Sequence, residues 1–185
     1  VRVLSAGDCD YGYRTSIFKT TEKNLIVTSV LFALPKTFEP VCGYKELEAI
    51  FKDRVPADAR ELEQAVRAVR AKKLPDPKVL PNAGSFFKNP VVTRTKMQRL
   101  LEETPSLVSY PLGGARAKLA AGWLIEACGL KGKRMGNAGV YERQALILVN
   151  HGGASGSEIK ALADEVAGSV KYRFGVELEP EPVIL

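Results

Sequence analysis

The segment Ala83–Pro90, which reads AGSFFKNP, combines residue types that could do chemistry. Two adjacent phenylalanines, Phe86 and Phe87, are unusual in a solvent loop and would anchor the segment in a hydrophobic core. Gly84 would let the backbone approach a ligand closely, and Ser85 would then present a hydroxyl at a fixed place. A serine hydroxyl is a weak acid, so it could protonate only a strongly basic carbon within hydrogen-bond reach. Spacing alone still favours a structural turn here.

A second candidate lies at His151–Ser155, where HGGAS resembles an oxyanion-hole loop. The stretch Gly153–Ser157 lacks the last glycine of the GxSxG motif of serine hydrolases. The sequence therefore favours a flexible turn between a strand and a helix, in which Ser155 begins the helix as its N-cap. Neither GxGxxG after a strand nor GxxxxGK[ST] occurs, so the nucleotide sites that those glycine loops build are unsupported.

Composition restricts the class of protein. The chain has 185 residues, of which 45% are hydrophobic and 26% charged, as in a folded globular protein rather than a disordered or collagen-like one. The net charge of +6 suits an anionic ligand or nucleic acid, but no basic stripe or aromatic platform supports nucleic acid. The separated Cys9, Cys42 and Cys128 and the single histidine argue against a metal site and favour a reduced, cytoplasmic setting. No apolar run approaches the roughly 20 residues of a membrane span.

Hydrophobic periodicity and turn residues predict the elements that would position these side chains. In the first part of the chain we expect β structure over 1–34, irregular chain over 35–57 and a helix from 58 to the prolines at 75 and 77. A loop or short strand over 81–90 and a short helix ending before 105 should follow. The rest should hold a helix over 118–128, a buried strand over 145–149, a helix from 155 closed by a glycine at 175, and a strand over 176–178. Asp58 with Glu61, and Ser155 with Glu158, have the spacing of capping boxes. This order of elements predicts an α+β fold.

The chain closely resembles the family of UDP-N-acetylenolpyruvoylglucosamine reductases in segments that occur in one consistent order: GYRTSIFK (12–19), KLPDPK (73–78), NAGSFFKNP (82–90), KLAAGWLIE (118–126), QALILVN (144–150) and LEPEP (178–182). Any one of these segments would be weak, but their shared order and spacing make coincidence implausible. The resemblance runs from about Asp8 to the end of the chain. The paired phenylalanines and the Tyr44 segment are similar to the subclass typified by enterobacterial enzymes.

The resemblance implies a flavoenzyme of peptidoglycan precursor synthesis. NADPH would reduce FAD, and the flavin would deliver hydride to the enolpyruvyl group of a UDP-sugar, giving UDP-N-acetylmuramate. The matching positions are Ser85 as proton donor, with Arg14 and Glu181 beside the substrate carboxylate. A guanidinium would stabilise charge that develops there, and a carboxyl kept protonated could donate to the same group. Without the resemblance these three would be a turn hydroxyl, a surface cation and a tail residue.

The resemblance also implies contacts with the substrate. Tyr44 resembles the tyrosine of a loop that closes over the UDP-sugar. Lys73, with Arg70 one turn before it, resembles the cationic group for the diphosphate. Four further positions match those lining the nucleotide-sugar and nicotinamide site: Asn89, Tyr110, Lys118 and Gln144. A surface polar residue remains the alternative for each of them. Trp123 and the cysteines are expected in the core.

The resemblance divides the chain into parts. Residues 1–74 would be the C-terminal part of an FAD-binding domain of the vanillyl-alcohol-oxidase type, 75–178 a complete α+β substrate-binding domain, and 179–185 a strand returning to the flavin domain. The family's glycine-rich flavin segments would lie upstream of Val1, so we expect an N-terminal truncation. Pro182 and Val183 depart from the family's pattern. The sequence leaves open a chain that only binds the UDP-sugar, without flavin or redox activity. We expect a monomer, with no nucleic-acid or membrane partner.

Overall fold

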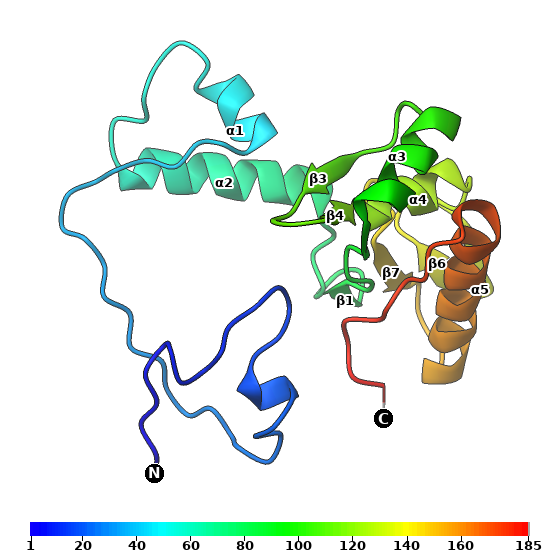
Figure 1. Ribbon diagram of the computed structural model, residues 1–185, viewed down its shortest axis with the longest axis horizontal. Helices are drawn as coiled ribbons and strands as arrows, with labels where there is room; N and C mark the ends of the chain where they lie inside the picture. The colour runs from blue at the N-terminus through cyan, green and yellow to red at the C-terminus, as the bar shows by residue number, and fades with distance from the viewer. Residues whose placement is uncertain (185) are drawn as a thin grey trace. The chain divides into compact units, whose positions relative to one another are not determined.

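The computed structural model describes residues 1–184, and the chain divides into two compact units, residues 1–39 and 40–185. The first unit contains one short 3-10 helix, η1 (Ile17–Lys19), and a tight turn closed by Gly12 and Thr15 (Figure 1). The backbone N–H of each of these two residues donates to the carbonyl of the other, at 3.0 and 3.4 Å. A Cβ on Gly12 would come within 2.9 Å of the Thr15 side chain, so a larger residue would require the Thr15 methyl group to shift.

The prediction of β structure over residues 1–34 is wrong for this unit. The apolar run that prompted it is exposed instead: Leu31 is 99% and Ile26 is 87% solvent-accessible. An extended segment becomes a strand only when a neighbour satisfies its backbone N–H and C=O groups. Residues 1–39 contain no strand to serve as that neighbour.

The second unit begins with two helices in contact, α1 (Lys45–Ile50) and α2 (Ala59–Lys73). The short α1 lies where we expected irregular chain. Half of the capping box predicted for α2 is formed: the Asp58 carboxylate accepts the backbone N–H of Glu61 at 2.8 Å, but Glu61 does not accept the N–H of Asp58. Glu61 in turn accepts from the N–H of Ala57 at 2.7 Å, one residue before the N-cap. The pair therefore satisfies two backbone donors at the start of the helix.

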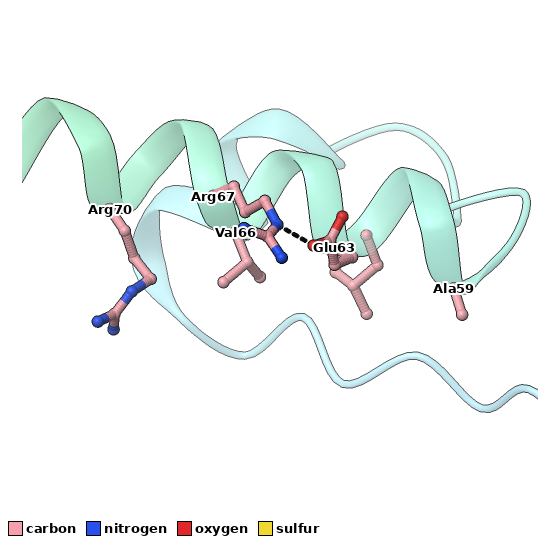
Figure 2. A pocket seen from close by; sticks show the side chains of 6 residues that line it. Ala59, Glu63, Val66, Arg67 and Arg70 are labelled. Carbon is pink, nitrogen blue, oxygen red and sulfur yellow. Dashed lines mark hydrogen bonds and ion pairs between the residues drawn. The ribbon is translucent and has the colours of Figure 1, made fainter.

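The apolar stripe that predicted α2 is only half-buried, and none of the helix's residues is fully buried. Figure 2 shows a shallow hollow along this helix; its lining residues are Ala59, Leu62, Glu63, Val66, Arg67 and Arg70. All of them belong to α2. The hollow is the exposed side of one helix rather than an enclosed ligand cavity.

Two antiparallel sheets form the rest of the unit, in agreement with the predicted α+β class. One has the strand order β1-β7-β6-β5 and the other β2-β4-β3. The first comprises β1 (Asn82–Ser85), β7 (Ile147–Asn150), β6 (Ala138–Val140) and β5 (Arg134–Met135). The second comprises β2 (Val91–Thr93), β4 (Arg116–Leu119) and β3 (Ser109–Pro111). The sequence predicted β7, left a loop or a short strand open at β1, and missed the other five strands.

Three helices accompany these sheets: α3 (Arg94–Glu103), α4 (Ala121–Ala127) and α5 (Gly156–Phe174). The predicted capping box of α5 is confirmed, with Ser155 and Glu158 each accepting from the other's backbone. Gly175 ends α5 in the left-handed conformation, with φ 59°. The helix predicted over 118–128 begins later, because Lys118 and Leu119 belong to strand β4. Within residues 1–184, no helix combines the length and apolarity needed to cross a membrane.

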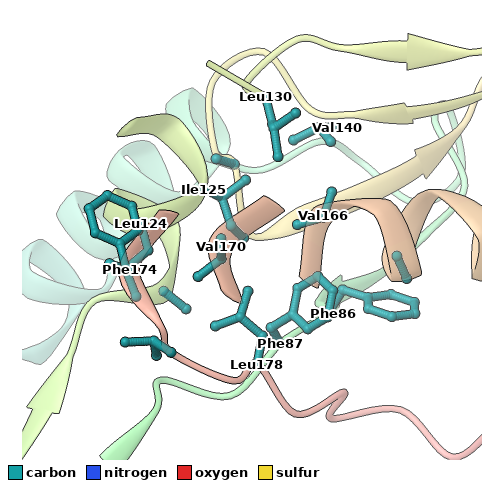
Figure 3. Packing of buried hydrophobic residues seen from close by; sticks show 14 of the residues in the cluster. Phe86, Phe87, Leu124, Ile125, Leu130, Val140, Val166, Val170, Phe174 and Leu178 are labelled. Carbon is teal, nitrogen blue, oxygen red and sulfur yellow. The ribbon is translucent and has the colours of Figure 1, made fainter. Parts of the chain in front are cut away.

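The core of the second unit lies between α4, α5 and the sheets. Phe86 and Phe87 belong to it, as predicted, with exposures of 6% and 2% and ring centroids 5.2 Å apart. Figure 3 shows the two rings near Leu178 and the α5 residues Val166 and Val170, members of the same cluster. The last predicted strand is not formed: Val176 and Leu178 are buried, but within residues 175–184 only Pro180 pairs, through an isolated bridge. The domain boundary predicted near residue 74 stays a prediction, although α2 ends there.

Candidate functional site

Ser85 is presented at the end of strand β1 by a turn that the Asn82 side chain holds. Asn82 donates to the Leu80 carbonyl at 2.8 Å and accepts the N–H of Gly84 at 2.9 Å. Gly84 has φ 73°, a left-handed conformation that favours glycine. A Cβ there would meet nothing within 4 Å, so the requirement is for conformation rather than for space. Ser85 itself is exposed and stands opposite Ile147 in the sheet.

The C-terminal tail runs antiparallel to the segment that follows Ser85. Phe86 accepts the backbone N–H of Glu181 at 2.8 Å, and Lys88 donates its N–H to the Glu179 carbonyl at 2.9 Å. Phe87 and Pro180 form the bridge between these two bonds. That pair exchanges no hydrogen bond of its own, so a proline without an N–H is tolerated there. The pairing sets the backbone of Glu181 beside the residue that follows Ser85.

An ion pair lies on the same short ladder. The Lys88 ammonium contacts the Glu179 carboxylate, and the side chains are 23% and 70% exposed. Lys88 and Glu179 are also joined through their backbones, so side chain and main chain tie the tail at one point. Neither residue was predicted from the sequence to belong to the site. No local signal could have found them, because they are far apart in the chain.

Asn89 and Gln144 each lie against the first turn of α4. The Asn89 Oδ1 accepts the backbone N–H of Ala121 at 2.9 Å, and the N-cap residue Ala120 supplies no side-chain bond. Asn89 therefore caps a helix from outside it. A Cβ on Gly122 would lie 3.0 Å from Gln144 Oε1, so the glycine leaves the space that the amide occupies.

Tyr110 and Lys118 face each other across strands β3 and β4. They are direct partners in the ladder, and the Lys118 ammonium lies 5.4 Å from the centroid of the Tyr110 ring. This distance is within the range of a cation–π interaction. The Pro90 carbonyl accepts the N–H of Leu119 at 2.9 Å. Asn89 thus lies beside the strand that carries Lys118.

Tyr44 and Lys73 are also in contact, where the start of α1 meets the end of α2. The Lys73 ammonium donates to the Tyr44 hydroxyl at 3.2 Å and lies 5.2 Å from the ring centroid. The same ammonium forms an ion pair with Glu46. The bond to Glu46 raises the pKa of Lys73 against the opposing effect of burial, and the bond to Lys73 lowers the pKa of Glu46. Arg70 lines the hollow on α2 (Figure 2).

Arg14 belongs to the first unit, where it occupies the tip of the Gly12–Thr15 turn. Its φ of 59° is left-handed, which is uncommon for a residue other than glycine. The two backbone bonds between Gly12 and Thr15 hold that conformation. Strained backbone of this kind concentrates at functional sites. The structure thus gives Arg14 a fixed, exposed position, and its catalytic role stays a prediction.

Metal chemistry finds no ready-made centre in the part of the chain that the structure describes. Within residues 1–184, no three His, Cys, Asp or Glu side chains lie close enough together to share a metal ion. Cys9, Cys42 and Cys128 are free thiols, and burial raises the pKa of Cys128. Trp123 packs against Phe174 at 5.9 Å and belongs to the rim of the core, as expected.

Comparison with known proteins addresses the resemblance found in the sequence. Residues 76–185 match the model of the UDP-N-acetylenolpyruvoylglucosamine reductase C-terminal domain. This chain belongs to the UDP-N-acetylenolpyruvoylglucosamine reductase family. The family resemblance predicted from the sequence is thereby confirmed, and the matched region contains both sheets and helices α3 to α5.

Several curated members of the reductase family match over nearly the whole chain. The chain is 52% identical to the reductase of Paraburkholderia xenovorans over 98% of its own length and 54% of the relative's. Identity to the Chromobacterium violaceum reductase is 53%, with 98% and 54% covered. For the Bordetella pertussis reductase it is 50%, with 98% and 52% covered. The chain spans about half the length of the curated relatives it matches.

Proposed function

We propose that the protein takes part in reducing the enolpyruvyl group of UDP-N-acetylglucosamine enolpyruvate to UDP-N-acetylmuramate, a cytoplasmic step of peptidoglycan precursor synthesis. The observation that carries the proposal is the backbone pairing that sets Glu181 beside Phe86, directly after Ser85. In the proposed reaction a flavin that NADPH has reduced supplies the hydride. The residues of this chain supply the proton and hold the substrate.

The proton would come from the Ser85 hydroxyl. Hydride addition to the enolpyruvyl double bond leaves negative charge on the neighbouring carbon and its carboxylate. That carbon is basic enough to take a proton from a hydroxyl within hydrogen-bond reach. Ser85 is exposed on a turn that Asn82 fixes, which suits a donor with one required position. Arg14 and Glu181 would stabilise the charge on the carboxylate, by a fixed cation and a hydrogen bond.

The remaining predicted residues would bind the UDP-sugar. Lys73 and Tyr44, already in contact through a bond of 3.2 Å, would take the diphosphate, with Arg70 nearby on the same helix. The cation–π pair of Lys118 and Tyr110 offers a charge and an aromatic face. Asn89 and Gln144 would contribute amides beside the start of α4, where the Asn89 Oδ1 accepts the N–H of Ala121 and Gln144 lies next to Gly122.

The flavin would not be held by this chain alone. Residues 1–39 offer a turn and one short 3-10 helix and no sheet, so this unit does not build a flavin-binding fold by itself. We propose that residues 1–74 are part of an FAD-binding domain of the vanillyl-alcohol-oxidase type. Residues 75–178 would be the substrate domain, and 179–185 would return to the flavin domain. The other contacts with FAD would come from the half of the relatives that the chain does not span.

Replacing Ser85 with alanine tests the proposal in a full-length reductase that contains this chain. We expect reduction of the flavin by NADPH to survive and its reoxidation by the enolpyruvyl substrate to slow by roughly 100-fold or more, because a general acid typically contributes that much. Ser157→Ala, the same change on exposed α5, should leave both half-reactions intact. Reoxidation near the wild-type rate in Ser85→Ala would rule out the proton-donor role.

A second candidate function is a UDP-sugar binding module without redox activity. The absence of a sheet from residues 1–39 favours it for the 185-residue chain in isolation. Flavin absorbance of the purified chain distinguishes the two, because a bound yellow chromophore would reject the binding-only function.

A further inference from the structure

The ammonium of Lys73 is held on two sides within the pair of helices α1 and α2. The Tyr44 hydroxyl accepts one of its bonds at 3.2 Å, and the Glu46 carboxylate accepts another. An ammonium has three donors, so both contacts leave it one. The side chains of Lys73 and Glu46 are 35% and 33% exposed, so a dissolved anion can reach the pair.

We propose that Glu46 is a built-in counter-ion, which occupies Lys73 until the diphosphate of the nucleotide sugar displaces it. This inference rests on the proposed function, which gives Lys73 the diphosphate. Competition with Glu46 for Lys73 would favour ligands that carry more than one negative charge. A ligand with one negative charge would replace the Glu46 carboxylate by a group of the same charge. A diphosphate brings more negative charge and more acceptor oxygens than the carboxylate that it displaces.

The position of the pair supports displacement rather than a permanent structural bond. Glu46 lies in the first turn of α1 and Lys73 in the last turn of α2. The dipole of α1 therefore favours the negative charge of Glu46, and the dipole of α2 favours the positive charge of Lys73. Both charges keep these interactions when the ion pair opens. The pair is half-buried and still reached by solvent, so opening it costs less than breaking a fully buried pair would. The shifts in pKa described above keep both groups charged near neutral pH, which the exchange requires.

If Glu46 competes with the ligand for Lys73, then removing its charge should raise the affinity for a diphosphate. Glu46→Gln removes the competing charge, so UDP and inorganic diphosphate should bind the 185-residue chain more tightly, by about two- to fivefold. Glu48→Gln is the matched control, because it removes the same charge from the exposed side of the same helix. In a Lys73→Gln background the Glu46→Gln change should lose its effect, as a double-mutant cycle measures.

Isothermal titration calorimetry with each probe decides the question, with helix content checked by circular dichroism. Weaker or unchanged binding in Glu46→Gln, or equal tightening in Glu48→Gln, would overturn the counter-ion role alone. No binding of UDP to the wild-type chain or to any variant would overturn the proposed binding function together with it. If Glu46→Gln loses helix content, Glu46→Asp replaces it. The shorter carboxylate reaches Lys73 less well, so binding should still tighten, by a smaller factor.

Discussion

The backbone N–H of Glu181 donates to the carbonyl of Phe86 at 2.8 Å. This bond, with the one from Lys88 to Glu179, attaches the C-terminal tail to the segment that carries Ser85. The segment is in turn anchored by Phe87, which is 2% exposed. The position of the tail therefore depends on packing in the hydrophobic core as well as on two backbone hydrogen bonds.

Removing the Phe87 ring should destabilise the second unit strongly. We expect Phe87→Ala to lower the free energy of unfolding by about 3–5 kcal/mol, because the change leaves a cavity in a closely packed core. Urea denaturation measures it. Tyr172→Ala, at a side chain that is 95% exposed, should stay within about 0.5 kcal/mol of wild type. A loss below about 1 kcal/mol for Phe87→Ala would contradict the packing in Figure 3.

Helix ends were the part of the fold that the sequence predicted best. The N-caps Asp58 and Ser155 and the terminating Gly175 lie where their types and spacing placed them. These signals act over three or four residues, so they depend little on the rest of the chain. The two phenylalanines were likewise predictable as core residues, because adjacent exposed rings would be unfavourable.

Strands were predicted poorly for the opposite reason. β2, β5 and β6 have two or three residues each, which is too short for a period of two to be recognised. The run over 26–34 is apolar enough for a strand, yet residues 1–39 offer it no partner. Whether a segment pairs depends on distant chain, and hydrophobicity alone does not carry that information.

The candidate site, like the fold, could be predicted from the sequence only in part. The residue type of Ser85 suggested chemistry, and the family resemblance assigned roles to both Ser85 and Lys73. The capping of α4 by Asn89 and the pairing of Glu46 with Lys73 join residues far apart in the chain, which periodicity does not reveal. Only the structure shows these two contacts. A substitution at Asn89 or Lys73 would break one of them as well as any contact with the substrate.

Two substitutions of Asn89 should distinguish its structural role from its proposed role in binding. Asn89→Ala removes the only side-chain oxygen that accepts the N–H of Ala121 among the described contacts, so it should cost about 1 kcal/mol of stability. Asn89→Asp keeps that oxygen and loses the amide donor. We therefore expect thermal unfolding of Asn89→Asp to stay near wild type while its affinity for UDP falls. Equal loss of stability in both variants would contradict capping by Oδ1.

The charge of Glu158 should make the stability of α5 depend on pH. The backbone N–H of Ser155, donating at 2.8 Å, is the main cause that lowers the pKa of Glu158, with the Ser155 hydroxyl second. A carboxyl whose pKa is lower in the folded protein stabilises it above the unfolded pKa of roughly 4.3, and that stabilisation is lost as pH falls through the folded pKa. Glu158→Gln keeps an acceptor oxygen but removes the charge from the helix N-terminus.

Glu158→Gln should therefore lower the melting temperature at pH 7, and the difference from wild type should shrink towards zero near pH 3. Thermal denaturation followed by circular dichroism at both pH values measures it. Glu102→Gln, at an exposed glutamate of α3, changes the net charge equally without touching a helix cap. A difference between wild type and Glu158→Gln that is the same at both pH values, or that Glu102→Gln reproduces, would show that the charge at the capping box does not stabilise α5.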